Sequence, residues 1–322
     1  MKPSDKKRKK DLRPLDSSVV PRYASIATFM RTPQCQDLDL VDVGIFGVPT
    51  DQGLSSRTGT RHGPAAIREA SRLIRMYNPT SHRSPFIRLN VADLGDVEVD
   101  VYSLKKTIDR ITAYVSQLRS KGVAPIAIGG DHVVPLGVLR GLYNGKPFGM
   151  LQVDSHPDTN DQFYGSRENH ATLFRRLHEE GIIDPKRVVQ LGLRGTQFSE
   201  DDARYGREVG FTVITMDDYE RMGREEVIKK IRSVLGDEPA YITIDVDGLD
   251  PADAPGTPAI EPGGIRMRDC QMILRGLTGL NIIGGDVCEV SPQLDPTNIT
   301  AINAANLAFE ILCVIADNEK FE

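Results

Sequence analysis

Acidic and histidine side chains gather at three places in this sequence where a short apolar segment ends. These places are Gly129–His132, Asp154–Asp158 and Asp245–Pro251. Each follows a segment rich in β-branched and apolar residues, which is typical of a strand buried on both faces of a parallel sheet. Because ligands of open α/β sheets bind beyond the carboxyl ends of the strands, we expect the three places to meet in one site.

The spacing within these places also favours convergence. In extended backbone, side chains at positions i, i+2 and i+4 lie on one face. The carboxylates and imidazoles that could converge are His132, Asp154, His156, Asp158, Asp245 and Asp247. Four carboxylates this close would repel one another strongly without cations. Oxygen-rich ligands with some histidine suit Mn²⁺, Fe²⁺, Co²⁺ or Ni²⁺, so the pattern predicts a metal site. Six ligands are too many for one ion that also holds water and substrate. Two ions about 3.5–4 Å apart would fit, and such pairs generate hydroxide at neutral pH.

Strands and helices alternate along the chain. The predicted strands are Val43–Val48, Ala124–Ile128, Gly149–Asp154, Val188–Leu191, Thr212–Met216, Ala240–Asp247 and Ile282–Val290. The clearest helix covers 103–121, where apolar residues recur at spacings of 4, 3, 4 and 3. Other helices are predicted over 65–76, 134–142, 171–180, 224–234, 266–277 and 299–315. This alternation predicts an α/β fold with helices on both faces of a mostly parallel sheet.

Composition limits the class of protein. The 322 residues carry a net charge of −5, which disfavours a nucleic-acid partner. Apolar runs are shorter than the 18 residues of a membrane span, so no membrane association is expected. The four cysteines form no metal or redox motif, and the basic N-terminus lacks the apolar region of a secretion signal, so we expect a cytoplasmic protein. We predict a disordered basic tail over residues 1–20 and a single domain over 21–322.

At these residues the sequence resembles the ureohydrolase family, which includes arginases, agmatinases and other guanidino-acid hydrolases. The resemblance starts near Pro21 and includes the three places above in order. It also covers the segments 169–172, 254–257 and 286–290. The segment Pro21–Arg31 is more similar to the agmatinase and guanidinobutyrase branch than to arginases.

The resemblance implies a three-layer α/β/α sandwich with two metal ions, usually manganese. One ion would take His132, Asp154, Asp158 and Asp245. The other would take His156 and Asp247 together with Asp154 and Asp245, which would bridge the two ions. The small-molecule substrate would be a guanidino compound, cleaved to urea and an amine.

The resemblance also implies roles for residues beyond the ligands. Asp158 would position the attacking hydroxide and take its proton, while His170 would protonate the leaving amine, since imidazole titrates near neutrality. Glu289 would orient the planar guanidinium through hydrogen bonds. The loop residues expected to contact the substrate tail are Asp161, Tyr164, Arg167 and Asn169.

Several residues beside the site depart from the usual pattern of the family. They are Val133, Ser155, Pro157, Ala171 and Pro258–Ile260. None removes a ligand, but neighbours of ligands tune metal affinity and choice. We therefore expect hydrolysis to survive and agmatine not to be the best substrate. The alternatives are guanidinobutyrate, guanidinopropionate, free guanidine, and alkylguanidines such as metformin, for which some relatives use Ni²⁺.

Two other classes of protein remain open. A deacetylase-like enzyme would hold a single zinc ion, and a subunit of a hetero-oligomeric hydrolase would normally lack ligands. The family resemblance implies a homo-oligomer, either a trimer or a hexamer. The number of ions bound per chain would separate the dinuclear hydrolase from both alternatives.

Overall fold

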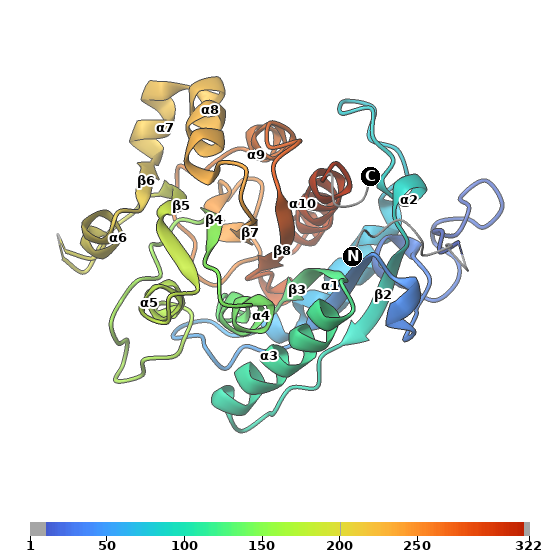
Figure 1. Cartoon of the computed structure of the whole chain (residues 1–322), viewed down its shortest axis with the longest axis horizontal. Helices are drawn as coiled ribbons and strands as arrows, with labels where there is room; N and C mark the ends of the chain where they lie inside the picture. The colour runs from blue at the N-terminus through green and yellow to red at the C-terminus, as the bar shows by residue number, and fades with distance from the viewer. Residues whose placement is uncertain (1–10, 200, 319–322) are drawn as a thin grey trace.

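The computed structural model describes residues 11–199 and 201–318, and its centre is one eight-stranded sheet (Figure 1). Every neighbouring pair of strands runs parallel, in the order β2-β1-β3-β8-β7-β4-β5-β6. The strands are β1 Val43–Val48, β2 Val91–Asp96, β3 Ala124–Gly129, β4 Phe148–Val153, β5 Ile183–Leu193, β6 Thr212–Thr215, β7 Ala240–Asp245 and β8 Ile282–Cys288. The predicted α/β fold with a parallel sheet is confirmed.

Helices cover both faces of the sheet, and two hydrophobic clusters fill the space between the layers. One cluster involves α1 Gly63–Ala70, α7 Met216–Met222, α8 Arg224–Leu235, α9 Met267–Arg275 and α10 Ile299–Ala316. The other involves α3 Leu104–Ser120, α4 Val134–Leu142 and α5 Leu173–Glu179. Two short helices, α2 Pro85–Arg88 and α6 Arg204–Val209, lie in connections. The result is a sandwich of helix, sheet and helix layers.

The alternation of side chains along each strand supplies both clusters at once. In β4, Leu151 and Val153 join the first cluster, whereas Phe148 and Met150 join the second. Strands with two buried faces need apolar residues at nearly every position, which is why they were recognisable as apolar runs. The predicted stripe on α3 is buried, except that Leu104 at the start of the helix is only half-buried.

One helix of the described chain, α10, is long and apolar enough to cross a membrane by length and composition. However, 78% of this 18-residue segment is buried inside the fold. It packs against β8 and joins the first hydrophobic cluster along most of its length. Its apolar composition is therefore accounted for by its place in the core.

Some elements were not predicted. Strand β2 was missed because its sequence includes Asp93, Gly95 and Asp96, which weaken the apolar pattern. The side chain of Asp93 is nevertheless buried, where it accepts a hydrogen bond from the backbone N–H of Phe29 at 2.8 Å and pairs with Arg68 at 2.9 Å. Helices α6 and α7 were also missed, because segments of six or seven residues show little periodicity.

Only the second half of the predicted disordered tail lies among the described residues. Its first ten residues lie outside the described residues, but residues 11–20 contact the body of the protein. Leu12 is buried in the second cluster, and its backbone N–H donates a hydrogen bond to Asn90. The backbone N–H of Leu15 donates to the carbonyl of Arg31 at 3.0 Å. The guanidinium of Arg31 also donates hydrogen bonds to Ser17 Oγ and to the carbonyl of Val20, each at 2.9 Å, so polar contacts join Leu12 in holding this segment.

Candidate metal centre

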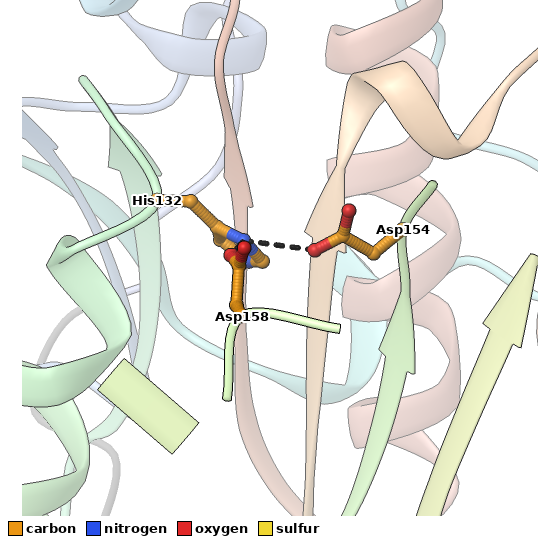
Figure 2. Close-up of side chains that lie close together, drawn as sticks. All are labelled: His132, Asp154 and Asp158. Atoms are coloured by element: carbon orange, nitrogen blue, oxygen red, sulfur yellow. Dashed lines mark hydrogen bonds and ion pairs between the residues drawn. The ribbon is translucent and has the colours of Figure 1, made fainter. Parts of the chain in front are cut away.

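Three strand ends meet at the carboxyl edge of the sheet and form a compact polar cluster. The strands β3, β8, β7 and β4 are consecutive in the sheet, so residues that follow them are neighbours. The Nδ1 atom of His132 lies 2.9 Å from Asp158 Oδ2 and 3.1 Å from Asp154 Oδ2. Figure 2 shows these three side chains converging, His132 from the loop after β3 and the two aspartates from the loop after β4. Asp245 Oδ2, from the end of β7, is 3.5 Å from the same nitrogen.

A second group adjoins the first. Nδ1 of His156 lies 3.1 Å from Asp247 Oδ2 and 3.7 Å from Asp154 Oδ1. Asp154 therefore presents Oδ2 to the group around His132 and Oδ1 to the group around His156. The structure brings together five of the six residues that were predicted as ligands in two groups that share this carboxylate, and the sixth, Asp245, lies beside the first group.

Turns, not extended backbone, produce this convergence, which differs from the sequence argument. The strand β4 ends at Val153, and Asp158 lies beyond it with a left-handed φ of 52°. After β7, Asp245 accepts a hydrogen bond from the backbone N–H of Asp247 at 2.8 Å and so caps a short 3₁₀ turn. The carboxylates thus hold the loops that carry them.

The glycines before His132 serve close packing. A Cβ atom at Gly130 would lie 2.1 Å from the carbonyl oxygen of Thr50, far inside van der Waals contact. The backbone of the β3 loop can therefore approach the loop after β1 only with glycine at this position. This approach places His132 in the interior, where its side chain is fully buried.

The electrostatics of the cluster fit divalent cations. Burial, followed by the charges of Asp247 and Asp154, raises the pKa of Asp245 well above its ordinary value. Burial and the neighbouring Asp154 raise the pKa of Asp158 to about 7. Burial lowers the pKa of His132, but its hydrogen bonds to Asp154 and Asp158 raise it by more. Without metal the cluster therefore retains protons, and two divalent ions could replace them as the positive charge the carboxylates require.

A hydrogen-bond chain behind His132 orients its ring. Nε2 of this histidine lies 2.9 Å from Thr243 Oγ1, and Thr243 donates to Asp286 Oδ1 at 2.9 Å. All three residues are fully buried. A histidine held this way through Nε2 presents Nδ1 in a fixed direction, which is the arrangement that metal-binding histidines require.

Glu289 has an oxygen available for a ligand. Glu289 directly follows β8, and its backbone has a left-handed conformation with a φ of 68°. Oε1 accepts a hydrogen bond from the backbone N–H of His132 at 2.7 Å. Oε2 is buried and has no hydrogen-bond partner among the described residues. A buried carboxylate oxygen without a donor is costly, and a cationic N–H donor would satisfy it.

His170 lies at the more open side of the cluster. Its Nε2 is 3.0 Å from Ser55 Oγ, and its ring centroid is 6.3 Å from that of Phe163. Burial, together with the charges of His156 and His132, lowers the pKa of His170 to about 4. The ring is therefore neutral at pH 7 in the absence of metal.

Sequence reasoning missed Ser55 and Phe163. Nothing local marks Ser55, because its partner lies 115 residues further along the chain. The adjacent aromatic residues Phe163 and Tyr164 could have been noticed in the loop after β4. Their ring centroids are 4.6 Å apart, and Phe198 joins them at 5.9 Å from Phe163.

The four residues predicted to contact the substrate tail are engaged in different ways. Asn169 is buried and holds its own loop, since Nδ2 donates to the carbonyls of Phe163 and Ser166. Asp161 and Arg167 pair with each other at 3.1 Å. The side chain of Tyr164 is 83% exposed. Contact of these four residues with a substrate stays a prediction.

Known proteins match this chain over nearly its whole length. The profile of the arginase family matches residues 41–314. The chain is 42% identical over 306 residues to a guanidinopropionase from Pseudomonas aeruginosa, which covers 95% of this chain and 96% of that protein. A guanidinobutyrase from the same bacterium is 40% identical over 94% of this chain and 96% of its own. The solved structure of proclavaminate amidinohydrolase from Streptomyces clavuligerus superimposes with a TM-score of 0.88 at 37% identity, covering 92% of this chain and 99% of that one.

Proposed function

This chain belongs to the arginase family, and from that premise we propose that it hydrolyses a guanidino compound to urea and an amine at two divalent metal ions. The observation that carries this proposal is the double cluster around Asp154, in which one carboxylate faces two histidine-containing groups. The buried Oε2 of Glu289, beside the same cluster, supports binding of a cation with N–H donors.

The two ions would be held by residues that already face one another. His132 and Asp158 would hold the first ion, and His156 and Asp247 the second, with Asp154 and Asp245 shared. When bound, the ions would supply a hydroxide nucleophile at neutral pH. Mn²⁺ is the proposed metal and Ni²⁺ the alternative, since both accept carboxylate and imidazole ligands.

The remaining steps fall to side chains of this chain. Glu289 binds the guanidinium through Oε2 and fixes its plane, because Oε1 is already held by the backbone of His132. Asp158 accepts the proton that is released as the tetrahedral centre forms. His170, which is neutral at pH 7, takes up a proton from solvent and donates it to the leaving amine, and Asp158 releases its proton to solvent before the next cycle. The hydrogen bond of His170 with Ser55 sets the orientation of its ring.

For the substrate tail, we propose a short guanidino acid. The support is that two relatives with about 40% identity are named for guanidinopropionate and guanidinobutyrate. The test is urea release from metal-free protein reloaded with Mn²⁺ or, separately, Ni²⁺. The panel contains guanidinopropionate, guanidinobutyrate, agmatine, guanidine and metformin. Highest kcat/KM on a guanidino acid supports this proposal, whereas agmatine ranking clearly first contradicts it.

A metal count on the same protein tests the reaction class. Two ions per chain are expected of the dinuclear hydrolase. One zinc per chain would favour the deacetylase-like alternative. No bound metal, together with no urea from any compound of the panel, would favour a subunit that needs a second chain type.

We also propose that the protein is a cytoplasmic homo-oligomer, either a trimer or a hexamer. The four free cysteines, three of them buried, suit a reducing compartment. Sedimentation of the purified chain tests the assembly, and fractionation of the source cells tests the location.

A further inference from the structure

Ser155 lies in the middle of the metal cluster without being one of its six predicted ligands. It stands between Asp154 and His156 in sequence, and its side chain is buried. Its hydroxyl donates a hydrogen bond to Asp247 Oδ1 at 2.7 Å, and its backbone N–H donates to the same oxygen at 3.0 Å. One oxygen of Asp247 is therefore held twice by a single residue that lies 92 positions away in the chain.

These two hydrogen bonds decide which oxygen of Asp247 is available. With Oδ1 anchored, Oδ2 is the oxygen that faces His156 Nδ1, at 3.1 Å. The carboxylate of Asp247 is thereby held in one orientation, with Oδ2 directed toward His156. Asp154 differs from it, because both of its oxygens face histidines of the cluster.

The hydroxyl of Ser155 also contacts His156, the other residue that is proposed to hold only the second ion. Ser155 Oγ lies 3.0 Å from His156 Nδ1. The side chain of His156 is 35% exposed, whereas the other five ligand side chains are buried. The position of the second ion is thus the less enclosed one. Ser155 contacts His156 and Asp247, the two residues proposed to hold only this ion. In contrast, His132 at the first position is oriented from behind by Thr243.

Taking the proposed dinuclear centre as its basis, we propose that Ser155 is a positioning residue of the second metal position, which fixes Asp247 through Oδ1 and thereby sets the affinity of the second ion. The backbone N–H would remain in any variant, so the side chain contributes one of the two donors. Loss of a partner that orients a metal ligand typically weakens metal binding about 10–100-fold.

The test compares Ser155→Ala with Ser71→Ala in metal-free protein. Ser71 is a suitable control because it is also a fully buried serine. Its hydroxyl accepts a hydrogen bond from the backbone N–H of Met30 and donates one to the carbonyl of Arg68, and neither residue belongs to the cluster. Mn²⁺ is titrated into each protein by calorimetry without substrate, and thermal unfolding of the metal-free forms is recorded. Ser155→Gly serves as a second variant if the alanine variant does not fold.

We expect two binding steps in the wild type. In Ser155→Ala the Kd of one ion should rise about 10-fold or more while the other stays within about threefold. Mn²⁺ added at two ions per chain should then give less of the electron paramagnetic resonance signal of the coupled pair. Ser71→Ala should lower thermal stability but leave both Kd values unchanged.

Three outcomes would overturn the inference. They are unchanged Kd values in Ser155→Ala, equal weakening of both ions, and fewer than two ions in the wild type. The experiment is independent of catalysis, so its result can be separated from that of the proposed function. If the chain binds two ions with the expected asymmetry but releases no urea from the panel, the proposed function fails and the role of Ser155 stands.

Discussion

Replacing Glu289 with glutamine removes a carboxyl group at the point where the guanidinium is proposed to bind, with little change in shape. Burial and the charge of Asp131 raise the pKa of this carboxyl well above its ordinary value, and a bound guanidinium would favour its charged form. The structure allows the effect to be estimated, because Oε1 is already used by the backbone N–H of His132 and Oε2 is the only oxygen left for a substrate. In Glu289→Gln, the amide oxygen keeps the bond to His132, so the amide NH₂ group points to the substrate. The oxygen that would accept a charge-assisted hydrogen bond from the guanidinium is thereby replaced by an NH₂ group, which is itself a donor and faces the N–H donors of the guanidinium.

The size of the loss follows from these two changes. A hydrogen bond to a charged group contributes about 1.5–3 kcal/mol, and a buried donor left without a partner costs about 1–3 kcal/mol more. The sum is about 2.5–6 kcal/mol, which corresponds to a loss of about 10²–10⁴-fold in kcat/KM. Because the guanidinium contacts Glu289 in the ground state as well, we expect a large part of the loss to appear as a higher KM.

The assay is urea release at several substrate concentrations with metal content measured on the same samples. Glu220→Gln, an exposed position on α7, is the matched control and should behave as the wild type. Thermal stability of Glu289→Gln should change little, because one buried polar atom without a hydrogen-bond partner replaces another. A change in kcat/KM below threefold at full metal content would refute the contact with the guanidinium.

Three further predictions concern the proton donor, the metal-free protein and the N-terminal segment. His170→Asn should lower kcat about 10²–10⁴-fold without changing metal content, and unchanged kcat would exclude it as the proton donor. In metal-free protein, the free energy of unfolding should fall as pH rises from about 4 to about 7. The pKa of Asp158 is raised to about 7, so its stabilising contribution is complete below its ordinary pKa and is lost as pH rises through 7. Denaturant titrations at pH 5, 6 and 7.5 in EDTA measure this slope, and a rising slope would contradict the burial argument. Leu12→Ala should lower the free energy of unfolding by about 2–3 kcal/mol, because the side chain is buried, and an unchanged denaturation midpoint would show that its contacts contribute nothing.

The sequence predicted well wherever a structural feature depends on neighbouring residues. Apolar runs identified seven strands within a few residues, and the stripe on α3 predicted its buried face. The elements that were missed are short or interrupted by polar residues. Helix α7 could have been found from its capping box, in which Thr215 and Asp218 bond reciprocally, because this motif is visible in sequence.

The site shows the limit of local reasoning. All six predicted ligands come together, but the alternation of extended backbone was the wrong reason for Asp158 and Asp247, which are placed by turns. The segment around Leu12 is another case, since its contacts with Asn90 and Arg31 lie far from it in the sequence and no local pattern marks them.

By itself, the sequence determined the parallel α/β fold. It also determined which strand ends carry acidic and histidine side chains. These features follow from short-range patterns, because a strand buried on both faces appears as a run of apolar residues and each helix as a local periodicity. Only the tertiary structure decided which oxygen of Asp247 is held by Ser155. It alone also decided that Oε2 of Glu289 has no hydrogen-bond partner among the described residues. It also decided which hydroxyl contacts His170. Those facts depend on atoms that lie about 90 to 160 positions apart in the chain and meet only when the sheet has formed.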